Sequence, residues 1–225
     1  MSTIQIFHGS SKIIEIPQFG AGKNHNDYGL GFYCTENLEM AKEWACPEKE
    51  NGFANKYEIE TNGLKILNLS SAQFTALNWL AILIENRRFD LDTPLMRQGF
   101  DYLKNNFLPD YSKADIITGW RADDSYFSFA KAFLSNQISY NQLTNAMKLG
   151  KLGEQFVLKS EKSFHQLKFA GYENVDYKIY YSKRKKRDDD ARLQYKNVST
   201  QEDLNGLFMI DVIREEIKSD DSRLR

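Results

Sequence analysis

Two glycines, Gly29 and Gly31, stand immediately before a short apolar run that ends at Cys34. Glycines this close to the start of a strand are typical of a bulge or of a close approach by another group. No helical pattern follows them directly, as it would in a Rossmann turn, and the sequence has no phosphate-binding loop with its lysine. The pattern therefore disfavours the classical nucleotide-binding folds.

Short runs with strand or helix character alternate irregularly along the chain, and this favours an α+β fold over a doubly wound parallel sheet. Residues 17–30 are expected to form a long loop, because proline and glycine recur there. Thr35 is expected to cap a helix that ends near Ala45. The apolar spacing predicts strands at 4–7, 31–34, 55–60, 64–69, 115–119, 155–159 and 175–181, and helices at 71–88, from Thr93-Pro94 onward, at 124–134 and at 139–149.

The composition changes at Lys183, where the basic run 183–187 meets the three aspartates 188–190. Opposite charges three or four residues apart favour a solvated helix, and a patch that binds nucleic acid or a partner is the alternative. A capping-box pattern at 199–202 predicts one more helix, with apolar residues between 204 and 217 packed on the domain. We therefore divide the chain into a domain at 1–182 and a charged helical C-terminal extension at 183–225.

The overall composition excludes several classes of protein. A net charge of −1 over 225 residues gives no strong field for nucleic acid or membrane. Two cysteines, Cys34 and Cys46, are too few for a disulfide framework or a cysteine-rich zinc site. No signal peptide is visible, and the longest apolar stretch, around 76–84, is far shorter than the roughly 20 residues of a membrane span. These features predict a cytoplasmic protein.

Candidate functional residues follow the first two predicted strands. His8 ends the first apolar run, Gly9 would let a ligand approach the backbone, and Ser10 adds a hydroxyl at the same edge. A lone histidine in this position is more often structural, and Tyr33 alone would usually be an aromatic packed on a sheet face. A cysteine hydrolase that uses Cys34 is disfavoured, because nothing around this apolar strand would lower the thiol pKa.

Three groups of residues together carry a resemblance to a known family. They are His8-Gly9-Ser10, then Asp27-Tyr28-Gly29-x-Gly31-Phe32-Tyr33-x-Thr35, then Ala41-Lys42-x-Trp44-Ala45, with fainter continuation at 117–124 and 155–164. This arrangement resembles a bacterial family related to divergent mono-ADP-ribosyltransferases of the histidine–tyrosine–glutamate type.

The resemblance implies an ADP-ribosyltransferase-like split β-sandwich with inserted helices and a cleft for NAD as co-substrate, without a metal. His8 would bond the adenosine-side ribose and Tyr33 would stack on the nicotinamide, with Gly9, Ser10, Gly31 and Thr35 as the other expected cofactor-binding residues. It also implies an enzyme that transfers ADP-ribose to a macromolecular acceptor, protein or nucleic acid. Such an enzyme would serve as a toxin or defence effector that an inhibitory, antitoxin-like protein holds in check.

The third element of the family pattern, a glutamate at the start of a later strand, is altered here. The aligned residue is Gln155, with Glu154 beside it, and only one of the two can enter a cleft because strand residues alternate between faces. Gln155 can bond a ribose hydroxyl but brings no charge, which would slow catalysis by about 10²-fold if it costs ~3 kcal/mol.

Two further consequences of this alteration stay open. Asp123 or Asp124 could supply the missing carboxylate, although acidic residues at a helix start are more often a complement to the helix dipole, and neighbouring Arg121 could contact a phosphate or lie on the surface. The alternative function is a catalytically weakened NAD-binding or partner-binding module.

Overall fold

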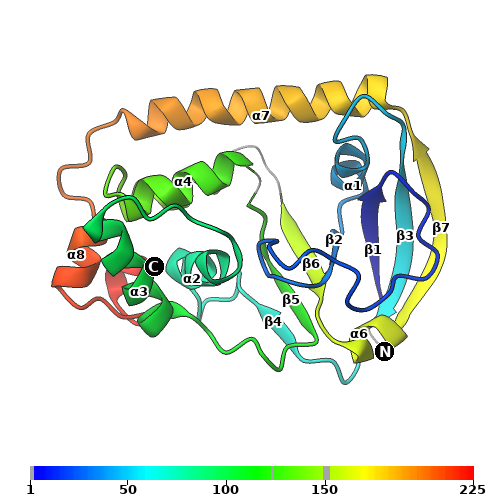
Figure 1. The fold of residues 1–225 in the computed structure, drawn as a ribbon, viewed down its shortest axis with the longest axis horizontal. Coiled ribbons are helices and arrows are strands. Elements are labelled where there is room, and N and C mark those ends of the chain that lie inside the picture. The colour runs from blue at the N-terminus through cyan, green and yellow to red at the C-terminus, as the bar shows by residue number, and fades with distance from the viewer. Residues whose placement is uncertain (1–2, 123, 149–152) are drawn as a thin grey trace.

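Two β-sheets meet through their edge strands in the computed structural model, which describes residues 3–122, 124–148 and 153–225 (Figure 1). In both sheets the neighbouring strands are antiparallel, apart from the parallel pair β4 and β5. The first sheet has the order β1 (Thr3–Ser10), β3 (Gly52–Glu60), β7 (Leu167–Val175), and the second has the order β2 (Phe32–Cys34), β6 (Glu154–Leu158), β5 (Ile116–Trp120), β4 (Ile66–Asn68).

The contact between the sheets is a backbone bridge between β1 and the end of β2. The Phe7 N–H donates to the Thr35 carbonyl at 2.8 Å, and the Thr35 N–H donates to the Phe7 carbonyl at 2.9 Å. A buried cluster takes side chains from both sheets, including Ile6 and Tyr57 from one and Phe156 from the other. The expected mixture of helices and strands is therefore confirmed, in a two-sheet arrangement that brings residue 8 close to residue 33.

The helix α1 packs on β1 and β3, and most of the other helices pack on one another beside the sheets (Figure 1). Every residue of α2 from Ala76 to Ile84 is buried, as expected for a helix that is apolar on almost all of its surface. The long helix α7 runs along one side of the molecule and contacts α1, α4 and α5 (Figure 1). The helices are α1 (Leu38–Ala45), α2 (Ala76–Asn86), α3 (Pro94–Phe107), α4 (Asp124–Leu134), α5 (Tyr140–Ala146), α6 (Glu161–His165), α7 (Tyr177–Ser199) and α8 (Met209–Arg214), followed by the short 3₁₀ turn η2 (Ser222–Leu224).

The cap of α1 corrects one prediction. Asn37, not Thr35, is the N-cap, and its side-chain oxygen accepts from the Met40 N–H at 3.1 Å. Thr35 cannot take this position, because its backbone is held in the bridge to Phe7. The bridge therefore moves the helix start two residues along the chain.

The region after residue 175 departs most from the sequence prediction. The predicted strand at 175–181 is wrong, since β7 ends at Val175 and Asp176 caps α7 by accepting from the Lys178 N–H at 2.9 Å. The pattern at 199–202 does not start a helix, because Ser199 ends α7, but the expected helix packed on the domain does form as α8, with Met209 and Val212 buried. The charged run forms the expected solvated helix, with an Arg192–Asp188 pair at 2.9 Å, and the division between 182 and 183 falls inside this helix. Over the described part of the chain, no helix combines the length and apolar character needed to cross a membrane.

Candidate functional site

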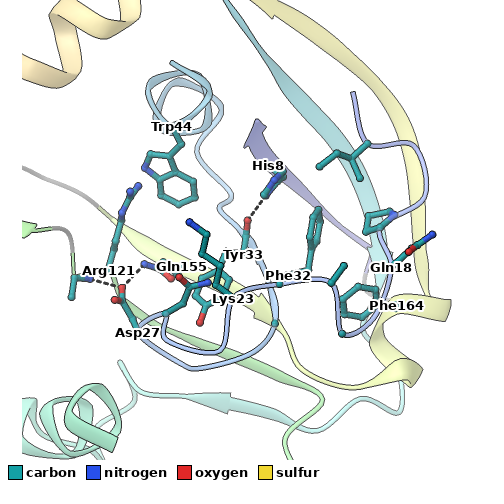
Figure 2. A pocket seen from close by; sticks show the side chains of 18 of the residues that line it. His8, Gln18, Lys23, Asp27, Phe32, Tyr33, Trp44, Arg121, Gln155 and Phe164 are labelled. Atoms are coloured by element: carbon teal, nitrogen blue, oxygen red, sulfur yellow. Dashed lines mark hydrogen bonds between the residues drawn. The ribbon is translucent and has the colours of Figure 1, made fainter. Parts of the chain in front are cut away.

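A cavity of about 480 Å³ lies where the two sheets meet (Figure 2). Its wall takes residues from β1 and β2, the loop that joins them, α1, the end of α2, the segment after β5, β6 and α6. Aromatic side chains (Phe32, Tyr33, Trp44 and Phe164) and cationic side chains (Lys23, Arg87 and Arg121) both line it. Such a lining suits a ligand that carries both flat rings and negative charge.

The loop between β1 and β2 forms one wall of the cavity and is pinned at both ends. Asn55, fully buried on β3, accepts from the Ile14 N–H at 2.8 Å and donates to the Lys12 carbonyl at 3.1 Å. At the other end, the Lys159 ammonium donates to the carbonyls of Tyr28 and Leu30. The predicted long loop is confirmed, and tertiary hydrogen bonds give it a defined path.

His8 is held in one orientation against the cavity. Its Nδ1 lies 2.7 Å from the Tyr33 carbonyl, and its ring stacks on Phe32 with centroids 4.4 Å apart. Because a carbonyl only accepts, Nδ1 carries the proton. Burial lowers the pKa of the imidazole, so the ring is neutral at pH 7 and Nε2 is an acceptor.

Tyr33 lines the same cavity, but its hydroxyl is already occupied. The hydroxyl donates to the Gly29 carbonyl at 2.6 Å and accepts from the Tyr28 N–H at 3.0 Å. Burial raises the pKa of the phenol well above its ordinary value, so it stays protonated. The hydroxyl therefore stabilises the turn at Tyr28 and Gly29 that precedes β2 (the glycine turn), and only the ring of Tyr33 is left to contact a ligand.

The strand β6 settles which of its first two side chains faces the cavity. Gln155 is 4% exposed and lines the cavity, whereas Glu154 is exposed and its carboxylate accepts from the Ser70 hydroxyl outside it. The Gln155 amide nitrogen donates to Asp27 Oδ2 at 3.0 Å. The residue that the resemblance aligns with a glutamate thus enters the cavity without a charge.

A buried carboxylate that the sequence reasoning did not select lies beside Gln155. Asp27 is 5% exposed, and its Oδ1 is 3.1 Å from Arg87 Nη1. Burial raises the pKa of the Asp27 carboxyl, and the Ala122 N–H and the Arg87 guanidinium limit that rise. Arg121, named above as a possible phosphate contact, lines the cavity with its guanidinium 4.1 Å from the Trp44 ring centroid. Asp27 and Trp44 both stand in motifs of the resemblance, although neither was assigned a role there, whereas no local signal marks Arg87.

Three of the expected cofactor-binding residues do not line the cavity. Gly9 packs against the backbone of α1 instead, so closely that a Cβ at this position would lie 2.0 Å from the Ala41 carbonyl oxygen. The Ser10 hydroxyl accepts from the Lys12 N–H at 3.2 Å, and Thr35 is buried in the bridge between the sheets. Gly31 does line the cavity.

The remaining candidates have other placements. Asp123 lies outside the described residues, and for Asp124 the structure describes only the backbone, at the start of α4. Cys34 is fully buried, and this burial raises the pKa of its thiol well above the ordinary value. That environment is the opposite of what a nucleophilic cysteine needs. Among the described residues, no three histidine, cysteine or acidic side chains gather as a metal site would require.

Comparison with known families gives one match. A model of the family described as "Protein of unknown function (DUF3990)" matches residues 4–169, about three quarters of the chain. The chain belongs to this family. Neither the curated proteins nor the solved structures contain a match.

The matched region has a clear relation to the site. It begins in β1 and ends early in β7, at residue 169, so it includes the second sheet, most of the first sheet and every described residue that lines the cavity, from His8 to Phe164. The helices α7 and α8 lie beyond it. The cavity is therefore a feature of the family region and not of the C-terminal helices.

Proposed function

We propose that this protein is an NAD-dependent ADP-ribosyltransferase, with the two sheets forming a split β-sandwich of that kind. The observation that carries the proposal is that His8 and Tyr33, 25 residues apart, line one cavity and are joined by the bond from Nδ1 to the Tyr33 carbonyl. These are the two positions that the family resemblance assigns to opposite ends of NAD.

His8 is suited to bind a ribose of the dinucleotide. With its proton on Nδ1 and its ring neutral, it presents Nε2 as an acceptor for a sugar hydroxyl. The stacking on Phe32 fixes the ring before the ligand arrives. A fixed acceptor loses less conformational entropy on binding than a mobile one, which favours affinity.

The other walls suit the remaining parts of NAD. The Tyr33 ring, immobilised by its two hydroxyl bonds, offers a flat face for the nicotinamide. Arg121 and Lys23 bring positive charge to a cavity that would hold a pyrophosphate, whereas the Arg87 guanidinium is paired with Asp27 at 3.1 Å. The volume of about 480 Å³ is in the range of small-molecule sites.

The proposed reaction breaks one bond and forms another. The bond between C1′ of the ribose and the nicotinamide nitrogen breaks, and its electron pair leaves with nicotinamide. The acceptor nucleophile then bonds to C1′ and releases its proton to solvent. Positive charge develops on the ribose between these events, so oriented acceptors and negative charge beside it lower the barrier. Gln155 would accept from a hydroxyl of this ribose.

We propose a macromolecular acceptor, either a protein or a nucleic acid, and an inhibitory antitoxin-like partner, consistent with a toxin or defence effector. The basic run on α7 lies outside the cavity and is partly paired with α1. Lys183 Nζ lies 3.3 Å from Glu39 Oε2, and Arg187 Nε lies 2.8 Å from Glu43 Oε2. This pairing reduces the field that the run offers to nucleic acid, so the activity assay should include both acceptor classes.

The test is incubation of the purified protein with NAD labelled in the adenosine half, with and without cell lysate or RNA. We expect nicotinamide release and labelled macromolecule, both lost in Tyr33→Ala and reduced in His8→Ala. Tyr172→Ala is the matched control, because Tyr172 is a half-exposed strand tyrosine on β7 outside the cavity. A wild-type protein that neither binds nor consumes NAD would refute the proposal.

A second candidate function is an NAD-binding module without turnover. The placement of uncharged Gln155 in the cavity and Glu154 outside it favours this alternative. Calorimetric binding of NAD that depends on Tyr33, together with an absence of nicotinamide release, would decide for the module.

A further inference from the structure

Asp27 is a buried carboxylate that lines the cavity, and each of its hydrogen-bonding partners among the described residues is a donor. Arg87 Nη1 donates to Oδ1 at 3.1 Å, while the Ala122 N–H at 2.9 Å and the Gln155 amide nitrogen at 3.0 Å donate to Oδ2. A protonated carboxyl would need an acceptor for its own hydrogen, and these contacts provide none. The surroundings therefore fit the ionised form.

This carboxylate determines how the Gln155 amide is oriented. Because Asp27 only accepts, the amide must turn its nitrogen toward Asp27 and its oxygen away, as Figure 2 shows. The amide oxygen is buried and has no hydrogen-bond partner among the described residues. A buried acceptor without a donor is costly, so this oxygen is available for a donor that a ligand brings.

The negative charge of Asp27 also acts on the Gln155 amide. The Asp27 carboxylate lies one hydrogen bond behind the Gln155 amide, so its negative charge polarises the N–H side and strengthens the oxygen as an acceptor. In a site with little water, such a charge is felt over a few ångströms. A glutamate at position 155 would have carried that charge itself.

We propose that Asp27 is a positioning residue of the ligand site, which presents the Gln155 oxygen to a ribose hydroxyl and supplies the negative charge that Gln155 lacks. This inference rests on the proposed NAD-dependent activity. The cavity would then bind a ligand whose hydroxyl group donates to the Gln155 oxygen and lies next to a carbon that becomes positively charged during the reaction. It also explains how a glutamine can occupy the place of the family glutamate.

The test compares nicotinamide release by the wild type with that by Asp27→Asn. Because the charge acts most strongly when the ribose is positive, kcat should fall about 100-fold while KM changes less than about threefold. Asp115→Asn is the matched control: Asp115 is a buried carboxylate outside the cavity that accepts from the Lys65 N–H at 2.8 Å and the Ser160 hydroxyl at 2.6 Å. Its neutralisation should lower stability and leave kcat unchanged.

A charge exchange keeps the inference testable if Asp27→Asn does not fold. The double variant Asp27→Asn with Gln155→Glu retains one carboxylate and one amide, with the donor between them reversed. The amide nitrogen at position 27 then faces the Ala122 N–H, so recovery should be incomplete, but at least tenfold of the lost kcat should return. A folded Asp27→Asn with wild-type kcat, or a folded double variant without turnover, would overturn the inference. Those results would leave the proposed function intact if the wild type is active. A wild type that neither binds NAD nor releases nicotinamide would remove both.

Discussion

Replacing Gln155 alone with glutamate should make the stability of the protein fall steeply as the pH rises. The Gln155 amide nitrogen is 3.0 Å from Asp27 Oδ2, so a carboxylate at 155 would face a second carboxylate at hydrogen-bonding distance. Two unit charges at that separation repel by about 5 kcal/mol at an effective dielectric constant of about 20. The folded variant avoids this repulsion by keeping a proton on one carboxyl.

The sign of the pH effect follows from this extra proton. The pair raises the folded-state pKa of one carboxyl above its value in the unfolded chain. The destabilisation by the carboxyl pair is therefore absent below the pKa of the unfolded chain, and it grows as the pH rises toward the pKa in the folded state. Each pH unit in that window costs the folded state about 1.4 kcal/mol. Between pH 5 and pH 7, the loss of unfolding free energy relative to the wild type should grow by up to about 3 kcal/mol.

Urea unfolding of the wild type, Gln155→Glu and the double variant Asp27→Asn with Gln155→Glu at pH 5, 6 and 7 measures this loss. The double variant holds a single carboxylate, as the wild type does, so its loss of unfolding free energy relative to the wild type should depend little on pH. If the Gln155→Glu loss were the same at pH 5 and pH 7, residues 27 and 155 could not be neighbours in the way described, and the reasoning would be refuted.

Three further substitutions test other parts of the structure. Tyr33→Phe should lower the unfolding free energy by about 1–3 kcal/mol, because the Tyr28 N–H and the Gly29 carbonyl lose their hydrogen-bonding partner. The same variant should keep its affinity for NAD in calorimetry, because the aromatic ring remains. Equal loss of affinity in Tyr33→Phe and Tyr33→Leu would contradict a stacking role. Gly9→Ala should destabilise by about 3 kcal/mol or more in thermal unfolding, since its Cβ would meet the Ala41 carbonyl oxygen at 2.0 Å, and an unchanged Tm would show that Gly9 does not pack on α1. Asn37→Ala removes the N-cap of α1 and should lower the unfolding free energy by about 1 kcal/mol. Ser199→Ala is the control, because Ser199 caps no helix start, and it should change the unfolding free energy by less than about 0.5 kcal/mol in the same assay.

Elements whose signals are local were predicted well. Thr93-Pro94 starts α3 as expected, because a threonine cap that accepts from the Met96 N–H and a proline at the first helical position act within one turn. The segment 175–181 failed because its alternation of apolar and polar residues resembles a strand, whereas the cap at Asp176 and the contacts of α7 with α1 favour a helix. The cap of α1 failed for a similar reason, since a bridge to a distant strand occupies Thr35.

The candidate site divides in the same way. His8 and Tyr33 lie on strands that the sequence predicts, β1 and β2, and the family resemblance selects them. The choice between Gln155 and Glu154 needed the register of β6, in which Gln155 pairs with Gly119 and Glu154 with Trp120. Asp27 and Arg87 are 60 residues apart, and no local pattern indicates that they meet.

The sequence alone determined where chain direction and local conformation change: the glycine turn before β2, the proline-started helix and the solvated charge run. These depend on backbone freedom and on contacts within a few residues. Only the tertiary structure decided that a buried aspartate, an arginine and a glutamine gather behind His8 and Tyr33. Their meeting depends on the pairing of edge strands and on the loop pinned between them, and a linear pattern cannot encode which distant donor will satisfy a buried carboxylate.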